Sequence, residues 1–417
     1  MEMFAGSPAS ALPSAPSATP RLRVGTPAFR RVGWAIFGCG FATFSILYGV
    51  QPLLPAFSQT FALSPAEASG ALSAATLAMA ALLIPMGAAA DRFGRKPMML
   101  WALSLAALLS LVSACAQEFW QVLTLRALVG MALAGLPAAA MAYLSEEVMQ
   151  DSIGRAMGLY VAGNALGALS GRLLAGALGA WFSWRVAIGV LALVGIVVAL
   201  LLTRALPASR QFRRLPAGGG GSLAELAAHC RNPLLRLLFV VAFLLAGCFI
   251  AVYNYLGYRL TAPAFALAPM QASWIFVLYL LALPGSTWAG RLADRIGPHP
   301  VLCAGAGAMA LGLLAMLAAQ LALLVAGVAL FTLGFFVAHA ATNGWVARCG
   351  GHARASANGL YLCSFYTGSS LLGSAAGLLW SAGGWHGVVA LLLGGVGLLG
   401  LALWRLGGLV RQPLPGN

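Results

Sequence analysis

The stretch GAAADRFGRKP, residues 87–97, recurs in a degraded form as GRLADRIGPHP, residues 290–300. Each copy follows a long apolar run and ends it abruptly with charged side chains. A motif that returns about two hundred residues later, at the same place relative to an apolar run, is typical of a membrane protein built from two copies of one unit. The repeat therefore predicts a duplicated helical membrane protein.

The composition agrees with this prediction. Of 417 residues, 61% are hydrophobic and 8% are charged, whereas roughly 25% of a soluble domain is charged. The net charge of +15 would suggest a nucleic-acid partner in a soluble protein, but membrane topology explains it better, so we expect no nucleic acid. The seven cysteines are scattered without a CxxC motif, which predicts neither a disulfide framework nor a metal site.

A membrane-spanning helix needs about 20 mainly apolar residues, and the apolar runs allow twelve spans. A turn is required at 319–320, because an unbroken helix there would be roughly 65 Å long. The prediction is an all-α integral membrane protein with twelve transmembrane helices in two pseudo-symmetric six-helix bundles. The approximate limits of the spans are 34–57, 71–90, 98–116, 120–144, 156–180 and 186–202 in the first bundle, and 234–258, 272–292, 301–319, 321–346, 357–382 and 388–406 in the second.

Basic residues separate the two sides of the membrane. If the amino terminus is inside, 20 of the 24 Lys and Arg residues fall on the cytoplasmic side. The other four are Arg126, Arg172, Arg185 and Arg259. This distribution satisfies the positive-inside rule and supports an even number of spans. We therefore expect both termini to be cytoplasmic.

The same pattern sets the expected domain limits. Residues 1–29, rich in Ala, Pro and Ser, predict a disordered cytoplasmic tail, and residues 30–203 form the N-terminal six-helix bundle. Residues 204–233 carry a basic run, four consecutive glycines and a short helical stretch, as expected for a cytoplasmic linker. Residues 234–408 form the C-terminal bundle, and residues 409–417 form a second cytoplasmic tail.

The loop motif also carries a family resemblance. The pattern Gly-x-x-x-Asp-Arg-x-Gly-Arg-Lys at residues 87–96 resembles the loop signature of the major facilitator superfamily. The resemblance covers residues 30–408. Further motifs of this family lie at residues 47–55, 126–130 and 163–171.

Three other segments, 142–148, 253–259 and 339–345, look most like the YnfM-type branch, which is drug/proton antiporter-like. This resemblance implies a monomeric secondary transporter of the bacterial inner membrane that works by alternating access. It also implies efflux of small organic compounds or drugs against an inward movement of protons. The expected partners are a small-molecule substrate, protons and membrane lipid.

The resemblance further implies that the loop motif is a gate. In this family the acid of the motif helps to latch the cytoplasmic face closed, a role that falls to Asp91. The alternative is a solvated basic loop. We expect Gly87 and Gly94 to allow close helix approach, and Glu146 either to pair with Arg95 or to end a solvated helix. The gating candidates are Gly87, Asp91, Arg92, Gly94, Arg95, Lys96, Glu146, Asp294 and Arg295.

The second copy of the motif is incomplete. It keeps Asp294 and Arg295 but has Pro298 and His299 where the first copy has its terminal basic pair. We therefore expect a weaker latch there, so that the two bundles share a fold but not an equal part in gating.

Two arginines lie inside the predicted spans. Arg126 lies roughly 10 Å into its helix, where a cation costs about 2.5 to 3.5 kcal/mol on insertion scales, and Arg172 reaches a similar depth from the periplasmic end. A snorkelling side chain is one way to compensate such a charge. A packed or cavity-lining side chain, favoured by Gly130 one turn beyond Arg126, is the other. We expect the two arginines to make the outer part of the N-terminal bundle electropositive.

Polar side chains inside the spans complete the candidate site. His339, Thr342 and Asn343 fall on one helix face, where a histidine can carry a proton, although a hydrogen-bonded core histidine is an equal alternative. Tyr253 and Asn254 can line a cavity, while an interfacial aromatic belt explains the tyrosine equally well. The candidates for substrate or proton binding are Arg126, Arg172, His339, Asn343, Tyr253, Asn254 and Asn164.

Other classes of function fit the sequence less well. Residues 395–400 match a dinucleotide fingerprint but lie inside a span without a strand, so no NAD is expected. The chain has no phosphate loop for ATP, and its five histidines are dispersed. We expect no enzyme activity, no cofactor and no metal.

One departure from proton-coupled drug exporters leaves the substrate open. No carboxylate lies clearly within a span, and buried arginines repel a cationic drug. One alternative is an importer or facilitator of an anionic or zwitterionic metabolite. A second alternative, from another class, is a non-transporting membrane sensor or scaffold.

Overall fold

The computed structural model describes residues 21–209 and 223–411. The first 20 residues of the predicted N-terminal tail, the glycines of the linker and residues 412–417 of the C-terminal tail lie outside the described residues. Residues 21–26, which we expected to be disordered, lie against the protein. Leu22 pairs with Val148 and its N–H donates to Glu147 O at 2.8 Å.

The first half of the chain supplies six membrane-spanning segments. The first span is interrupted between α1 and α2, and the fourth consists of α5 and α6 in succession. The elements are α1 (Pro27–Tyr48), η1 (Gln51–Leu53), α2 (Leu54–Phe61), α3 (Pro65–Phe93), α4 (Arg95–Ser113), α5 (Phe119–Leu133), α6 (Leu136–Glu147), α7 (Ile153–Trp181) and α8 (Trp184–Ala205).

The second half repeats this plan after the short helix of the linker, α9. Its second span, which is the eighth of the chain, contains a stretch of 3-10 helix, η2, between α11 and α12. The elements are α9 (Leu223–Arg231), α10 (Pro233–Thr261), α11 (Pro269–Ser273), η2 (Trp274–Leu281), α12 (Ala282–Ile296), α13 (Pro298–Ala315), α14 (Leu321–Cys349), η3 (Gly351–Ala353) and α15 (Arg354–Arg411).

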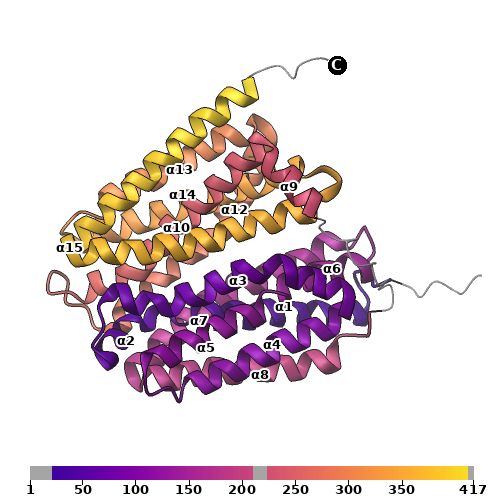
Figure 1. The fold of residues 1–417 in the computed structure, drawn as a ribbon, viewed down its shortest axis with the longest axis horizontal. Helices are drawn as coiled ribbons and strands as arrows, with labels where there is room; N and C mark the ends of the chain where they lie inside the picture. The colour runs from indigo at the N-terminus through magenta and orange to yellow at the C-terminus, as the bar shows by residue number, and fades with distance from the viewer. Residues whose placement is uncertain (1–20, 210–222, 412–417) are drawn as a thin grey trace, which may run out of the picture.

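The long element α15 contains the last two spans. The described residues hold 11 helices that are long and apolar enough to cross a membrane, but a straight helix of 58 residues would measure about 87 Å, nearly three bilayer cores. The backbone leaves the helical region at Gly383 and Gly384, and Figure 1 shows the chain turning back there. The predicted all-α, twelve-span fold is confirmed, as is the turn between α13 and α14.

The two halves lie side by side. Figure 1 shows α1–α8 on one side and α9–α15 on the other, with α3 running along the first arm of α15. We call the end that carries Gly94 and Gly297 the motif end, and the end that carries Ala62 and Gly383 the far end. The repeat is visible in the packing. A side chain at Gly167 would collide with the backbone of α1, and one at Gly368 would collide with the backbone of α10.

The motif glycines are fixed by backbone conformation. Gly94 ends α3 with φ 103° and ψ 152°, and Gly297 ends α12 with φ 87° and ψ 159°. Only glycine adopts this region without strain. The two copies of the motif therefore share one turn between consecutive spans.

Gly297→Ala tests this requirement, because open space surrounds a side chain at this position and only backbone strain opposes it. We expect a loss of about 1–3 kcal/mol, measured as a lower melting temperature in detergent. The matched control is Gly307→Ala inside α13, which also faces open space and should be neutral or stabilising. An equal melting temperature for the two variants would contradict the prediction.

Candidate functional site

An ion-pair cluster holds the motif end of the first half together. Arg95, at the start of α4, is only 6% exposed. Its Nε and Nη2 atoms donate to Glu146 Oε1 at 3.0 and 2.8 Å, and its Nη1 donates to Asp91. Asp91 lies near the end of α3 and Glu146 near the end of α6. The cluster therefore joins three helices of one half, and the expected contact between Glu146 and Arg95 is present.

Lys96 and His299 occupy equivalent positions in the repeat and make equivalent contacts. Lys96 Nζ donates to Thr203 O at 3.1 Å and to Leu206 O at 2.5 Å, at the end of α8. His299 Nε2 donates to Leu403 O at 2.9 Å, in the last arm of α15. Each ties the third span of its half to the sixth through a hydrogen bond from its side chain to a backbone carbonyl. The second copy thus keeps this contact although the residue differs.

The other gating candidates are less constrained. Arg92 is exposed, with its guanidinium carbon 5.6 Å from the centre of the Phe93 ring. Asp294 and Arg295 are exposed, and neither forms an ion pair within residues 21–209 and 223–411. A side chain at Gly87 would lie 3.6 Å from Ala138 Cβ, an ordinary contact. The expectation that Gly87 is needed for close helix approach is therefore wrong, because the helices leave room for a methyl group there.

Arg126 is compensated by backbone carbonyls. It is 3% exposed. Its Nε donates to Ala71 O at 3.1 Å, its Nη1 to Ile46 O at 2.9 Å and its Nη2 to Leu47 O at 2.6 Å. The last two carbonyls belong to the final turn of α1, where carbonyls lack intrahelical partners and a positive charge is favoured. Arg126 is packed and does not snorkel.

Arg172 lies where the two halves meet. It is 1% exposed, and its Nε donates to Gln51 Oε1 at 2.7 Å. Its guanidinium carbon lies 4.4 Å from the ring centres of Tyr48 and Tyr279 and 5.7 Å from that of Phe276. Aromatic faces attract a cation at these distances. No carboxylate of the described chain lies within ion-pair distance of this guanidinium.

Gln51 links Arg172 to the second half. The Gln51 Nε2 atom donates to Asn254 Oδ1 at 2.7 Å, and both side chains are 1% exposed. Asn254 Nδ2 is buried without a hydrogen-bond partner in the described chain. Arg172, Gln51 and Asn254 therefore form a buried polar chain between α7, η1 and α10. Nearer the far end, Ser58 and Tyr258 add another cross-half hydrogen bond of 2.8 Å.

Two more candidates are held by side chains of the second half. The Tyr253 hydroxyl lies 2.7 Å from Thr332 Oγ1, so this tyrosine is buried and lies away from any interfacial belt. His339 Nδ1 lies 2.7 Å from the Tyr361 hydroxyl. The His339 ring also stacks on Phe335, with ring centres 5.5 Å apart.

The structure does not bring all the candidates together. Asn343 is exposed, and no hydrogen bond joins it to His339 in the described chain. Thr342, between them in sequence, donates to Ala338 O of its own helix. Asn164 is half-buried on α7 beside Gly40 of α1. The shared polar face expected for His339 and Asn343 is therefore not formed.

Comparison with known proteins decides the family. The family model described as Major Facilitator Superfamily matches residues 36–262 and 254–417. The chain belongs to the major facilitator superfamily.

Its relatives include the uncharacterized MFS-type transporter YybF of Bacillus subtilis (strain 168), 40% identical over 94% of this chain and 96% of the relative. The inner membrane transport protein YnfM of Escherichia coli (strain K12) is 38% identical over 92% of this chain and 93% of the relative. A bacterial homolog to the human lysosomal transporter Spinster, solved in an inward-facing and unoccupied conformation, has the same fold, with a TM-score of 0.80, 17% identity and coverage of 94% and 100%.

Family membership makes the chain a multi-pass membrane transporter that binds a small-molecule substrate, and no enzyme. A transporter excludes the alternative of a non-transporting sensor or scaffold. Three residues around Arg172 were missed by sequence reasoning: Gln51, Phe276 and Tyr279. Gln51 could have been found from the sequence, because it is a polar residue inside an apolar run and stands next to Pro52. The rings of Phe276 and Tyr279 carried none, because their contacts with Arg172 cross between distant helices.

Arg126→Ala tests whether this arginine holds the interrupted first span. Removing it leaves three buried carbonyls without their charged donor, so we expect a loss of about 2 kcal/mol or more and a lower melting temperature in detergent. Arg348→Ala is the matched control, since Arg348 is exposed and unpaired within the described chain. A melting temperature equal to that of the control would show that the three hydrogen bonds do not stabilise the fold.

Proposed function

We propose that the transporter moves a small organic compound with a negatively charged or zwitterionic group by alternating access, and exports it in exchange for protons. The observation that carries this proposal is Arg172. A buried guanidinium is costly unless it is paired, and this one has aromatic rings and polar side chains as partners but no carboxylate of the described chain. An anionic substrate group supplies the missing charge.

The partners of Arg172 come from both halves. Gln51 and Tyr48 belong to the first half, and Tyr279 and Phe276 belong to the second. Separation of the halves at the far end breaks the contact between Gln51 and Asn254 and withdraws Tyr279 from the guanidinium. The cation then faces the opened space with fewer partners, and a charge-assisted hydrogen bond to a substrate carboxylate or phosphate replaces them.

The hydrogen bonds between halves support a particular conformational state. Within the described residues they lie toward the far end and the middle. They join Gln51 to Asn254, Ser58 to Tyr258, Ser73 to Ser370 and Ser374, and Ala80 O to Cys363. The ion pairs of the motif end join helices of the same half. We propose that the far end is closed in this state. The motif end closes in the alternate state, when Asp91 takes part in the latch.

We also retain the proposed orientation, with the motif end and both termini cytoplasmic in a cell inner membrane and the transporter acting as a monomer. The positive-inside rule supports this orientation, because the motif end carries most of the basic residues. The domain limits, with bundles at 30–203 and 234–408, stay part of the proposal.

The proposed proton carrier is His339. Its ring is enclosed by Phe335, Phe365 and Tyr361 and is hydrogen-bonded to the Tyr361 hydroxyl. Among residues 21–209 and 223–411, no carboxylate lies within ion-pair distance of His339. Export follows from the resemblance to the YnfM-type branch.

The direction has an alternative that Arg172 supports equally, an importer or facilitator of an anionic or zwitterionic metabolite. Inside-out and right-side-out vesicles separate the two. Accumulation of the substrate in inside-out vesicles, with protons released, supports export. Accumulation only in right-side-out vesicles, or equilibration without accumulation, would replace export with import or facilitation.

Arg172→Gln tests the substrate class in these vesicles, with a panel of matched anionic, zwitterionic, neutral and cationic compounds. We expect the uptake of anions to fall about tenfold or more, because the loss of one charge-assisted hydrogen bond weakens binding by about that factor. The uptake of neutral compounds should change little. Arg185→Gln is the matched control. Arg185 also stacks on a tryptophan ring and donates to a carbonyl, Ala116 O, but contacts only the first half. Unchanged anion uptake in Arg172→Gln would refute the proposed substrate class.

His339→Ala tests proton coupling, with proton release recorded beside substrate flux. We expect downhill flux to persist while substrate-dependent proton release is lost. His386→Ala is the control, because His386 is exposed at the far end. Tyr361→Phe removes only the hydrogen bond and should shift the pH profile of transport. If His339→Ala keeps full coupling, another group carries the proton.

A further inference from the structure

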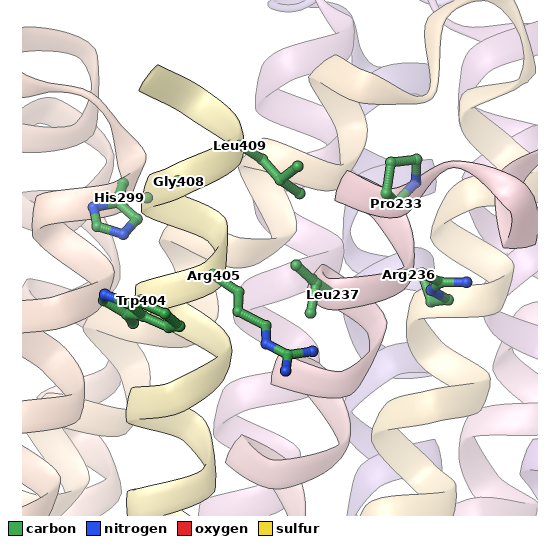
Figure 2. Close-up of a pocket in the computed structure, with 9 residues that line it drawn as sticks. Pro233, Arg236, Leu237, His299, Trp404, Arg405, Gly408 and Leu409 are labelled. Atoms are coloured by element: carbon green, nitrogen blue, oxygen red, sulfur yellow. The ribbon is translucent and has the colours of Figure 1, made fainter. Parts of the chain in front are cut away.

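A pocket of about 540 Å³ opens at the motif end of the second half, between the start of α10 and the end of α15. Figure 2 shows Arg405 reaching from α15 toward Leu237 of α10, with Trp404 and His299 on the other side. Arg236, Leu237 and Pro233 share one face of α10, while Arg405 shares one face of α15 with Gly408. Two basic faces of different helices therefore border one pocket.

The two arginines of this pocket have no acidic partner in the part of the chain that the structure describes. Both are exposed, and neither makes an ion pair or a hydrogen bond within residues 21–209 and 223–411. Glu225, on the neighbouring helix α9, accepts a hydrogen bond from Ser356. The pocket thus presents two uncompensated guanidinium groups, which are suited to oxygens of a phosphate.

The wall of the pocket is fixed. The hydrogen bond from His299 Nε2 to Leu403 O, 2.9 Å long, ties α13 to α15. Gly407 lies against the His299 ring, so closely that a side chain there would come within 3.1 Å of Nε2. Beside this wall, Trp404 is 74% exposed. An exposed tryptophan at the end of a spanning helix is the side chain expected at the level of lipid headgroups.

An exposed apolar stripe leads from the pocket toward the middle of the membrane. Leu401 and Leu398 lie one and two turns below Arg405 on the same face of α15, and Val240 lies one turn below Arg236 on α10. All three are exposed. A soluble anion gains nothing from contact with this apolar stripe, whereas the acyl chain of a lipid packs against it. Charge at the end of the helices and apolar surface beneath it match the two parts of a phospholipid.

We infer that this pocket binds an anionic phospholipid, with its phosphate on Arg236 and Arg405 and an acyl chain along Leu401 and Leu398. Basic pockets between spanning helices bind such headgroups. The site lies outside the contact between the two halves and is independent of the transport proposal. The bound lipid joins α10 to α15, the first and last spans of the second half.

The test is native mass spectrometry of the full-length, delipidated transporter titrated with phosphatidylglycerol or phosphatidylcholine. We expect one tightly retained phosphatidylglycerol and no retained phosphatidylcholine. The double variant Arg236→Gln/Arg405→Gln should weaken retention about tenfold or more. The conservative pair Arg236→Lys/Arg405→Lys should keep most of it. The matched control, Arg291→Gln/Arg348→Gln, removes two exposed arginines of the same half elsewhere and should retain the lipid as the unmodified transporter does.

Three outcomes overturn the inference. Equal retention of phosphatidylcholine would show that the pocket does not select charge. Equal loss in the control pair would show a general charge effect. Displacement of phosphatidylglycerol by an equal concentration of inorganic phosphate would assign the pocket to a soluble anion. Melting temperatures recorded for every variant establish that the protein under test is folded.

Discussion

Every backbone polar group inside hydrocarbon needs a partner within the protein, and the interrupted first span is where this constraint shapes the transporter most. The helix stops at Tyr48, and Pro52 has no N–H to donate. Two carbonyls of the last turn, those of Ile46 and Leu47, accept hydrogen bonds from Arg126. Beyond the interruption, Gln51 accepts from Arg172. Arg126 and Arg172 therefore both depend on the same break in one helix.

Duplication preserved the backbone of the two halves more closely than their side chains. The turn at Gly94 returns at Gly297 with nearly the same dihedral angles. The contact that Lys96 makes with the end of α8 returns as the contact of His299 with Leu403 O of α15, because both side chains can donate a hydrogen bond to a carbonyl oxygen. The ion pairs of Arg95 have no counterpart, since Pro298 stands in the equivalent position. The halves therefore share a framework and differ in charge.

The candidate site was predictable in part. Arg126 and Arg172 stood out because a cation deep in an apolar run needs partners, and both donate hydrogen bonds within the protein. The compensating groups were not predictable, because backbone carbonyls and aromatic rings carry no sequence signal of their own. The helical spacing of His339 and Asn343 predicted a shared polar face, but the two side chains differ in exposure. Helix spacing gives the direction of a side chain relative to its neighbours, not what lies opposite it.

The sequence by itself determined the number of spans, the turns between them, the duplication and the family, because a bilayer enforces long apolar runs and a fixed motif ends them. Only the tertiary structure decided which groups meet. The fold places Gln51 against Asn254 across the two halves. It also places Arg236, in the first span of the second half, beside Arg405, in the last span of that half. Such contacts depend on how helices far apart in the chain pack together, and neither composition nor periodicity records that packing.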